Sequence, residues 1–157
     1  MTNAARISMH DYHKAAPQVF DALRALGQAV ADSGLAKDLV ELIKVRASQV
    51  NGCAYCLQFH LNEARKLALP AAKLDQLATW HESPVYSPRE SAALAWTEAL
   101  CRMPAGPVAE ADYTGLQAQF SEKEIVFLTA AIANINAWNR ICGPLHFAPP
   151  SPVAQPG

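Results

Sequence analysis

Apolar residues recur at helical spacing along most of this chain. Residues 16–33 are a clear example, because their apolar side chains lie three or four positions apart, at Val19, Leu23, Leu26 and Val30. This spacing places them on one face of a helix. No stretch of four to eight residues alternates β-branched and polar side chains between turn signals, as a strand would. The pattern therefore predicts an all-α fold without a sheet.

Turn and capping signals divide the chain into six to seven helices. The sharpest signals are two capping boxes, Ser87 with Glu90 and Ser121 with Glu124. In such a box the serine hydroxyl accepts from the glutamate amide, and the glutamate side chain returns the bond. The expected helices span about 16–33, 37–50, 53–69, 71–80, 87–103, 109–119 and 121–142. The last is apolar nearly all round and should lie centrally.

Length and composition indicate a single domain over 1–157. At roughly 100 to 200 residues per domain the chain makes one unit, and its 51% of hydrophobic residues supply a sizeable core. Charged residues make up only 17%, against a typical value of about 25%, so we expect another subunit to cover part of the surface. Five prolines fall within residues 144–157, which predicts an extended or frayed C-terminal tail.

The charge pattern argues against several partners. Thirteen basic and 14 acidic residues leave a net charge of -1 without a run of Lys or Arg, so no nucleic-acid partner is expected. The N-terminus lacks the apolar core of a signal peptide. The longest apolar stretch, 125–138, is interrupted by Asn134 and Asn136, so no membrane segment is expected. We predict a cytoplasmic protein, whose four cysteines are first read as reactive, metal-binding or buried thiols.

The segment from Asn51 to His60 carries the candidate chemistry. If a helix begins at Asn51-Gly52, Cys53 and Cys56 fall in its first turn, where free amides and the positive end of the helix dipole favour a thiolate. His60 stands four residues after Cys56 and seven after Cys53. All three side chains therefore share one face of the helix.

This arrangement suits a dithiol redox cycle. One thiolate attacks an oxidant and becomes a sulfenic acid, the second thiol closes a disulfide, and His60 moves the proton. The neighbouring His60 favours Cys56 as the attacking thiol, whereas thioredoxin-like helices attack with the earlier cysteine. Spacing alone leaves the order of the two cysteines open.

Two other interpretations compete with the redox one. Cys53, Cys56 and His60 could be zinc ligands, but zinc knuckles place a second ligand pair a dozen or more residues away. Neither Cys101 nor Cys142 belongs to such a pair. The cysteines could also be inert, packed in a core with the histidine. A CxxC pair that opens a helix and has a histidine four residues on favours redox chemistry.

The same segment belongs to a longer pattern of residues. The pattern comprises Glu41-Leu42-Ile43, Arg46, Ser48-Gln49-Val50-Asn51-Gly52-Cys53-Ala54-Tyr55-Cys56, His60, Ala64-Arg65, Trp80, Glu82-Ser83-Pro84, Glu90, Ala92-Ala93-Leu94 and Trp138-Asn139-Arg140. Over about 19–149 the chain thereby resembles the alkylhydroperoxidase D-like branch of the carboxymuconolactone decarboxylase superfamily. The Glu, CxxC and His core is the specific part, and the Trp-Asn-Arg ending resembles the small single-domain members.

This resemblance implies an all-α fold that assembles as a homotrimer or homohexamer and acts as a thiol peroxidase or disulfide reductase. It implies that Cys56 is the peroxidatic thiol and Cys53 the resolving thiol. His60 would accept and donate the proton, and Glu41 would end a proton relay to His60. No bound cofactor or metal is implied. The reductant would be an external thiol, resembling the lipoyl-bearing protein of the best-known members.

Some residues depart from the family pattern or have a simpler explanation. Tyr55 stands where some peroxidase members carry a second histidine, so a shorter relay and weaker peroxide turnover are expected. Glu41 lies three residues before Lys44, and without the resemblance an exposed ion pair is the simpler interpretation. The decarboxylase members lack the CxxC pair, so lactone decarboxylation is not expected.

Three functions are thus compared: a thiol-dependent peroxidase, a disulfide reductase that does not act on peroxide, and a non-catalytic helical scaffold or zinc-holding module. The first is the leading hypothesis. Cys101 and Cys142 are expected to be small buried hydrophobes. The polar residues of the last helix are expected to be structural, because an otherwise apolar helix must satisfy their donors and acceptors.

Overall fold

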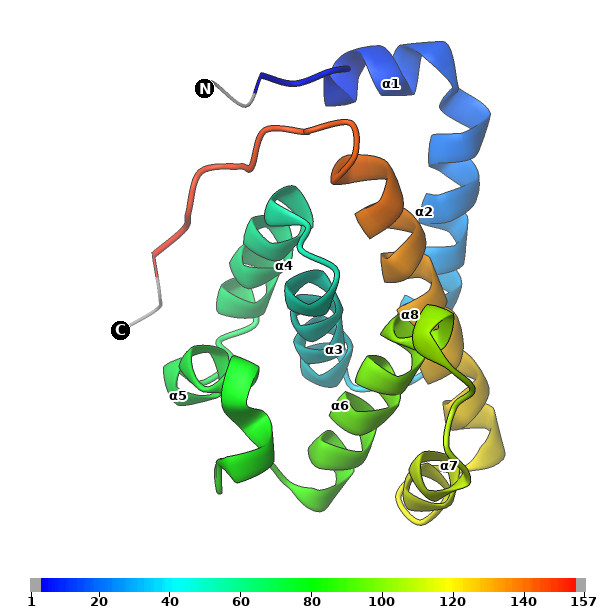
Figure 1. Ribbon diagram of the computed structural model, residues 1–157. Helices are drawn as coiled ribbons and strands as arrows, with labels where there is room; N and C mark the ends of the chain where they lie inside the picture. The colour runs from blue at the N-terminus through cyan, green and yellow to red at the C-terminus, as the bar shows by residue number, and fades with distance from the viewer. Residues whose placement is uncertain (1–3, 155–157) are drawn as a thin grey trace.

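The computed structural model describes residues 4–154 and confirms the all-α class (Figure 1). Within that range the chain forms α-helices and two short 3-10 helices, and no strand. The α-helices are α1 (Met9–Ala15), α2 (Pro17–Ala31), α3 (Lys37–Val50), α4 (Ala54–Lys66), α5 (Ala71–Asp75), α6 (Pro88–Cys101), α7 (Glu110–Gln117) and α8 (Glu122–Cys142). The 3-10 helices are η1 (Leu77–Glu82) and η2 (Met103–Ala105).

Most helix boundaries follow the predicted signals, with two differences. Both capping boxes are present, at the starts of α6 and α8. The helix expected over 71–80 is instead divided into α5 and η1, and the backbone at Thr79 is not helical. Helix α1 was not predicted. It is capped by Ser8 but has no buried residue. Its sequence therefore shows no run of apolar residues at helical spacing that would predict it.

Helices α3 and α8 form the centre of the fold. Helix α3 contacts α4, α6 and α8, and α8 also contacts α2. As predicted, α8 is central: its side chains Leu128, Ile132 and Ile135 are all buried. By length and composition α8 could also span a membrane, but a core helix of a soluble protein has the same length and composition.

The turn between α3 and α4 places the CxxC pair. Helix α3 ends at Val50 with Asn51 as its C-cap, and Gly52 turns the chain with a φ of 68°, a left-handed conformation that glycine adopts without strain. Cys53 then caps α4, since its Sγ accepts from the Cys56 amide at 3.3 Å. Only Cys56 therefore lies within the first turn, and Cys53 lies at the cap just before it.

The C-terminal tail is extended, as predicted, but it is held against the helices. Phe147 is buried, and the Asn62 side chain of α4 donates to the Ser151 carbonyl and accepts from the Val153 amide. Figure 1 shows this segment running past α4. The tail therefore covers one side of the helix that carries the cysteines. The last predicted tail residues, 155–157, lie outside the described range.

Candidate active site

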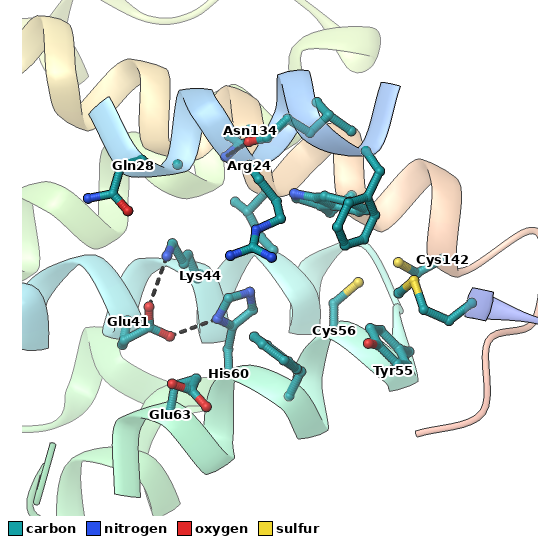
Figure 2. A pocket seen from close by; sticks show the side chains of 17 residues that line it. Arg24, Gln28, Glu41, Lys44, Tyr55, Cys56, His60, Glu63, Asn134 and Cys142 are labelled. Carbon is teal, nitrogen blue, oxygen red and sulfur yellow. Dashed lines mark hydrogen bonds and ion pairs between the residues drawn. The ribbon is translucent and has the colours of Figure 1, made fainter. Parts of the chain in front are cut away.

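A cavity of about 650 Å³ lies between α2 and the helices α3, α4 and α8 (Figure 2). Its volume is within the range of about 300 to 1,000 Å³ that is usual for pockets that bind small molecules. Three of the predicted site residues line it, namely Glu41, Cys56 and His60. Cys53 is not part of the cavity wall. The fold therefore brings residues from two consecutive helices to one cavity and places the two cysteines differently.

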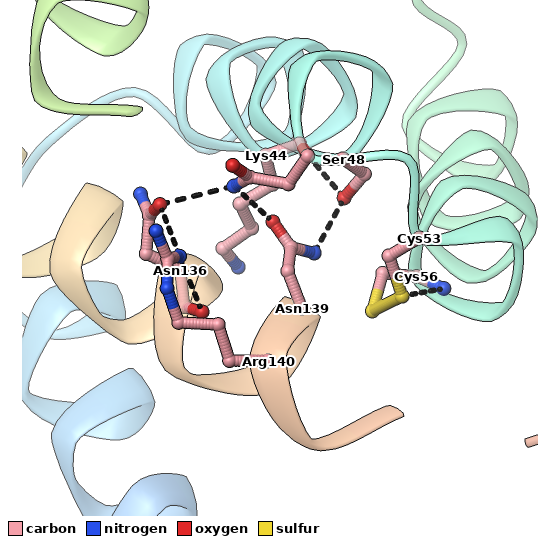
Figure 3. Close-up of a disulfide and its surroundings, with 8 residues drawn as sticks. Lys44, Ser48, Cys53, Cys56, Asn136, Asn139 and Arg140 are labelled. Atoms are coloured by element: carbon pink, nitrogen blue, oxygen red, sulfur yellow. Dashed lines mark hydrogen bonds between the residues drawn. A yellow bond between two sulfur atoms is a disulfide. The ribbon is translucent and has the colours of Figure 1, made fainter. Parts of the chain in front are cut away.

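Cys53 and Cys56 form a disulfide, with their Cα atoms 5.4 Å apart (Figure 3). Both residues are buried, at 1% and 2% exposure. In Figure 2 the sulfur of Cys56 points toward the cavity. A molecule in the cavity therefore approaches the Cys56 sulfur, whereas Cys53 does not line the cavity.

His60 and Glu41 form the second half of the site. The Nδ1 atom of His60 lies 2.7 Å from Oε2 of Glu41, and the other carboxylate oxygen accepts from Lys44 Nζ at 2.9 Å. Glu41 is only 9% exposed. The ion pair with Lys44 therefore exists, but it is not the exposed surface pair that the sequence alone favoured, because the same carboxylate also holds His60.

The surroundings of Glu41 keep it charged. Burial alone raises the pKa of its carboxyl, but the hydrogen bond and charge of His60, together with Lys44, outweigh burial and lower the pKa below its ordinary value. The carboxylate accepts a hydrogen bond from Nδ1 of His60, which leaves the other ring nitrogen, Nε2, outside this contact. Within residues 4–154, His60 makes no hydrogen bond to either sulfur of the disulfide.

Helix α2 completes the cavity, and sequence analysis missed its contribution. Phe20, Leu23 and Arg24 line the cavity opposite α4. Phe20 packs against Trp138 of α8, with ring centroids 5.7 Å apart. No motif marks these residues, because only tertiary packing brings α2 over Cys56 and His60, which lie more than 30 positions further along the chain.

A polar network lies next to the CxxC turn (Figure 3). The side-chain amide of Asn51 donates to Oδ1 of Asn139 at 2.8 Å and to Oδ1 of Asn136 at 3.0 Å. The side-chain amide of Asn139 in turn donates to the Ser48 hydroxyl at 3.2 Å. Asn136 and Asn139 of α8 thus have structural partners, as expected. Because Asn51 caps the end of α3 two residues before Cys53, the network ties the CxxC turn to α8.

The remaining two cysteines are buried, as predicted. Cys101 is 7% exposed and Cys142 is 1% exposed. Burial raises the pKa of both thiols, and that of Cys142 rises to about 12. Cys142 also lines the cavity, but a thiol with this pKa stays protonated at neutral pH and is a weak nucleophile.

The zinc interpretation finds no ligand set in the described chain. Residues 4–154 contain no group of three or more His, Cys, Asp or Glu side chains placed to hold a metal ion. The two sulfurs of the CxxC pair bond to each other, and His60 bonds to Glu41.

Known proteins match the chain in sequence and in structure. Residues 17–99 match the family model described as the carboxymuconolactone decarboxylase family. The uncharacterized protein YdfG of Bacillus subtilis (strain 168) is 34% identical over 130 residues, which cover 83% of this chain and 88% of YdfG.

Two crystal structures share the fold. One is of an Agrobacterium tumefaciens protein of unknown function, named as a candidate antioxidant defence protein AhpD; it is 38% identical, with a TM-score of 0.89 over 94% of this chain and 99% of that chain. The other is the debrominase Bmp8, 22% identical, with a TM-score of 0.80 over 88% and 74% of the two chains. At 22% identity, the debrominase shows the common fold alone. The chain belongs to the carboxymuconolactone decarboxylase family, in its alkylhydroperoxidase D-like branch.

Proposed function

We propose that this protein is a thiol-dependent peroxidase of the alkylhydroperoxidase type, which reduces hydroperoxides with the Cys53 and Cys56 pair. One arrangement carries the proposal: Cys56 faces an open cavity, bonds to Cys53 and shares the cavity wall with His60, which Glu41 orients. The antioxidant name of the Agrobacterium tumefaciens protein supports the same activity.

The proposed cycle begins with the reduced pair. His60 takes the proton of Cys56, and the thiolate attacks the terminal oxygen of the hydroperoxide. The O–O bond breaks, one oxygen stays on Cys56 as sulfenic acid, and the alkoxide takes a proton from His60 and leaves as an alcohol. The Cys53 thiol then attacks the Cys56 sulfur, which forms the disulfide and releases water. Two electrons from an external dithiol restore the pair by exchange.

This proposal assigns different roles to the two cysteines because only Cys56 lines the cavity. Cys56 would be the peroxidatic thiol and Cys53, capping the same helix, the resolving one. Glu41 would orient His60 and balance its charge while the ring holds the proton. Tyr55 also lines the cavity and, lacking a titratable imidazole, would leave proton transfer to His60 alone.

The proposal extends to partners and location. The reductant would be an external thiol, carried by a lipoyl-bearing protein, and no bound cofactor or metal would take part. Exposed apolar side chains on α2 and α8, including Val19, Leu26 and Val126, support assembly as a homotrimer or homohexamer. The cytoplasm, a reducing compartment, would keep Cys101 and Cys142 as free thiols.

A thiol titration tests the proposal. The fully reduced protein has four thiols, and one equivalent of tert-butyl hydroperoxide should remove two of them and release one tert-butanol. Peptide mapping should place the new disulfide between Cys53 and Cys56, with Cys101 and Cys142 still reduced. Consumption of peroxide without loss of these two thiols, or no consumption at all, would contradict the proposed function.

The same assay separates the competing functions. A disulfide reductase would turn over a small disulfide with dihydrolipoamide while leaving tert-butyl hydroperoxide intact. A zinc-holding module would be purified with stoichiometric zinc that protects Cys53 and Cys56 from alkylation. The peroxidase is expected to turn over the hydroperoxide faster than the disulfide and to contain no stoichiometric zinc.

A further inference from the structure

The cavity beside Cys56 is much larger than hydrogen peroxide needs. A molecule of water occupies about 30 Å³ in the liquid, and hydrogen peroxide has only one more oxygen atom. The cavity of about 650 Å³ would leave most of its wall untouched by so small an oxidant. Its size fits a substrate with a substantial organic body.

The wall of the cavity is divided into an apolar and a polar end. Around Cys56 it is formed by apolar or aromatic side chains, including Phe20, Tyr55, Phe59 and Trp138. At the other end, Figure 2 shows Gln28, Glu41 and Lys44 close together. Such a wall matches a molecule that is apolar near the reacting group and polar further away.

Most of the charged groups around the polar end already have partners. Glu41 holds His60 and Lys44, so these three groups satisfy one another. The Glu63 carboxylate pairs with Lys66 at 2.6 Å. An added anion would therefore displace existing pairs at these positions.

Arg24 is the exception. In Figure 2 its side chain extends from α2 into the cavity, on the side of His60. Within residues 4–154 it has no ion pair and no hydrogen-bonded carboxylate, and its Cζ atom lies over the Phe20 ring, 5.9 Å from the ring centroid. Because Arg24 is exposed, its charge is hydrated and free to accept an incoming anion.

We infer that the protein prefers hydroperoxides that carry a carboxylate on an apolar body, and that Arg24 binds this carboxylate. The inference rests on the proposed peroxidase function and names its substrate class. A guanidinium presents two parallel N–H groups that match one carboxylate, while the apolar wall receives the carbon chain. The hydroperoxide group would then lie toward Cys56, because the two ends of the substrate match the two ends of the cavity.

The reductant does not account for Arg24 equally well. A lipoyl group attached to its carrier protein is an amide and has lost its carboxylate, so it offers Arg24 no anion. Free dihydrolipoic acid does carry one. Comparing free dihydrolipoic acid with dihydrolipoamide therefore shows whether Arg24 serves the reductant.

The test compares linoleic acid hydroperoxide with its methyl ester, both below the concentration at which they form micelles. For the wild type, we expect kcat/KM to favour the acid by about tenfold, the size of one charge-assisted hydrogen-bonded pair. In Arg24→Gln the acid-to-ester ratio should fall to about one. Arg24→Lys should lie between, because it keeps the charge and loses the paired N–H groups.

Matched controls separate this effect from a general change of charge. Lys123 is exposed in the first turn of α8 and does not line the cavity. The variant Lys123→Gln also removes one positive charge, but it should keep the tenfold acid-to-ester ratio. Binding of unoxidised linoleic acid, followed through quenching of tryptophan fluorescence, should weaken about tenfold in Arg24→Gln and stay unchanged in Lys123→Gln.

Each outcome decides a different point. An acid-to-ester ratio near one in the wild type, or a tenfold ratio retained in Arg24→Gln, would overturn the inference while turnover of tert-butyl hydroperoxide upholds the proposed function. A variant that changes only the preference for dihydrolipoic acid over dihydrolipoamide would also overturn it. If the wild type reduces none of these hydroperoxides, the proposed function fails, and the substrate class with it.

Discussion

Two buried glutamates of this molecule each contact a histidine and border a cavity, yet only one of them belongs to the candidate active site. Glu41 lies beside His60, and Glu98 lies beside His81. Glu98 is the more buried, at 3% against 9% exposure. In both, burial raises the carboxyl pKa, and hydrogen bonds and nearby charges outweigh it and lower that pKa. By titration behaviour alone the two carboxylates cannot be told apart.

Their partners make the difference. Glu98 accepts from Trp80 at 2.8 Å and pairs with Arg46 at 2.7 Å and Arg102 at 2.9 Å, so its oxygens are occupied by fixed donors. Its histidine, His81, is mostly exposed and stacks on Trp80. The neighbouring cavity of about 330 Å³ has no cysteine in its wall.

Glu41 differs because it holds a histidine that shares its cavity with the sulfur of Cys56. A buried carboxylate with a lowered pKa therefore has a structural role where fixed donors occupy both of its oxygens. It becomes a candidate for catalysis where a nucleophile stands within the same cavity.

The largest effect should come from the nucleophile. Replacing Cys56 by serine should lower kcat/KM for tert-butyl hydroperoxide by at least about 10³-fold, because an alcohol is a far weaker nucleophile than a thiolate at neutral pH. The measurement is peroxide consumption with dihydrolipoamide as reductant. Cys101→Ser, a matched change at a buried thiol outside the cavity, should keep its activity. Full turnover by the Cys56 variant would refute the proposed cycle.

The next largest effect concerns the other glutamate and is on stability. Glu98→Gln removes the charge that balances Arg46, which is only 12% exposed at its side chain, and breaking a buried pair costs about 3 kcal/mol. The free energy of unfolding should fall by this amount in urea titrations at neutral pH. Peroxide turnover below the unfolding transition should change little.

The pH dependence gives this stability prediction its sign. Because the folded-state pKa of Glu98 is lowered from 4.5, its stabilising charge is fully present above pH 4.5 and is lost as the pH falls through the folded value. The difference between wild type and Glu98→Gln should therefore be largest near neutrality and shrink in acid. A difference that grows in acid would show that the Glu98 pKa is raised instead.

These two glutamates also show how far sequence reasoning reaches. Glu41 could be selected because it precedes a CxxC segment in a recognisable pattern, and the helix phase of Cys56 and His60 follows from spacing alone. The partners of Glu98 could not be predicted, since Arg46 and Trp80 come from other elements, 52 and 18 positions away.

The same limit applies to the cavity. Arg24 and Phe20 stand on an ordinary amphipathic helix, and only the packing of α2 against α8 turns them toward Cys56. Local signals, such as the capping boxes, fixed the helix boundaries well. Contacts between distant helices depend on shape complementarity over the whole core, and no local pattern encodes them.

A smaller effect on catalysis should follow from Glu41→Gln, the counterpart of Glu98→Gln. The glutamine oxygen can still accept from Nδ1–H of His60 and keep the ring in place, but it cannot balance the proton that His60 takes. We expect kcat/KM to fall about tenfold, with a change in unfolding free energy smaller than for Glu98→Gln, because Lys44 is more exposed than Arg46.

The pH profile distinguishes this positioning role from a merely structural one. The pKa of Glu41 is lowered from 4.5, so the carboxylate stays charged above that value. The activity ratio of wild type to Glu41→Gln should therefore be constant near neutrality and approach one only as the pH falls through the lowered pKa of Glu41. Glu41→Asp should retain more activity than Glu41→Gln, whereas an activity ratio that is independent of pH down to acid would contradict the role.

The smallest effect should be that of Cys142→Ala. Cys142 shares the cavity with Cys56 and the same buried cluster with both cysteines of the pair, so its position alone would allow it to exchange with the disulfide. Its pKa of about 12 prevents this, because roughly one thiol in 10⁵ is ionised at pH 7. Turnover should stay within about twofold of the wild type, a change of less than about 0.5 kcal/mol in activation free energy. A large loss of turnover, together with a Cys56 to Cys142 disulfide in peptide maps, would instead show that burial does not keep this thiol unreactive. Cys142 would then share the resolving role with Cys53.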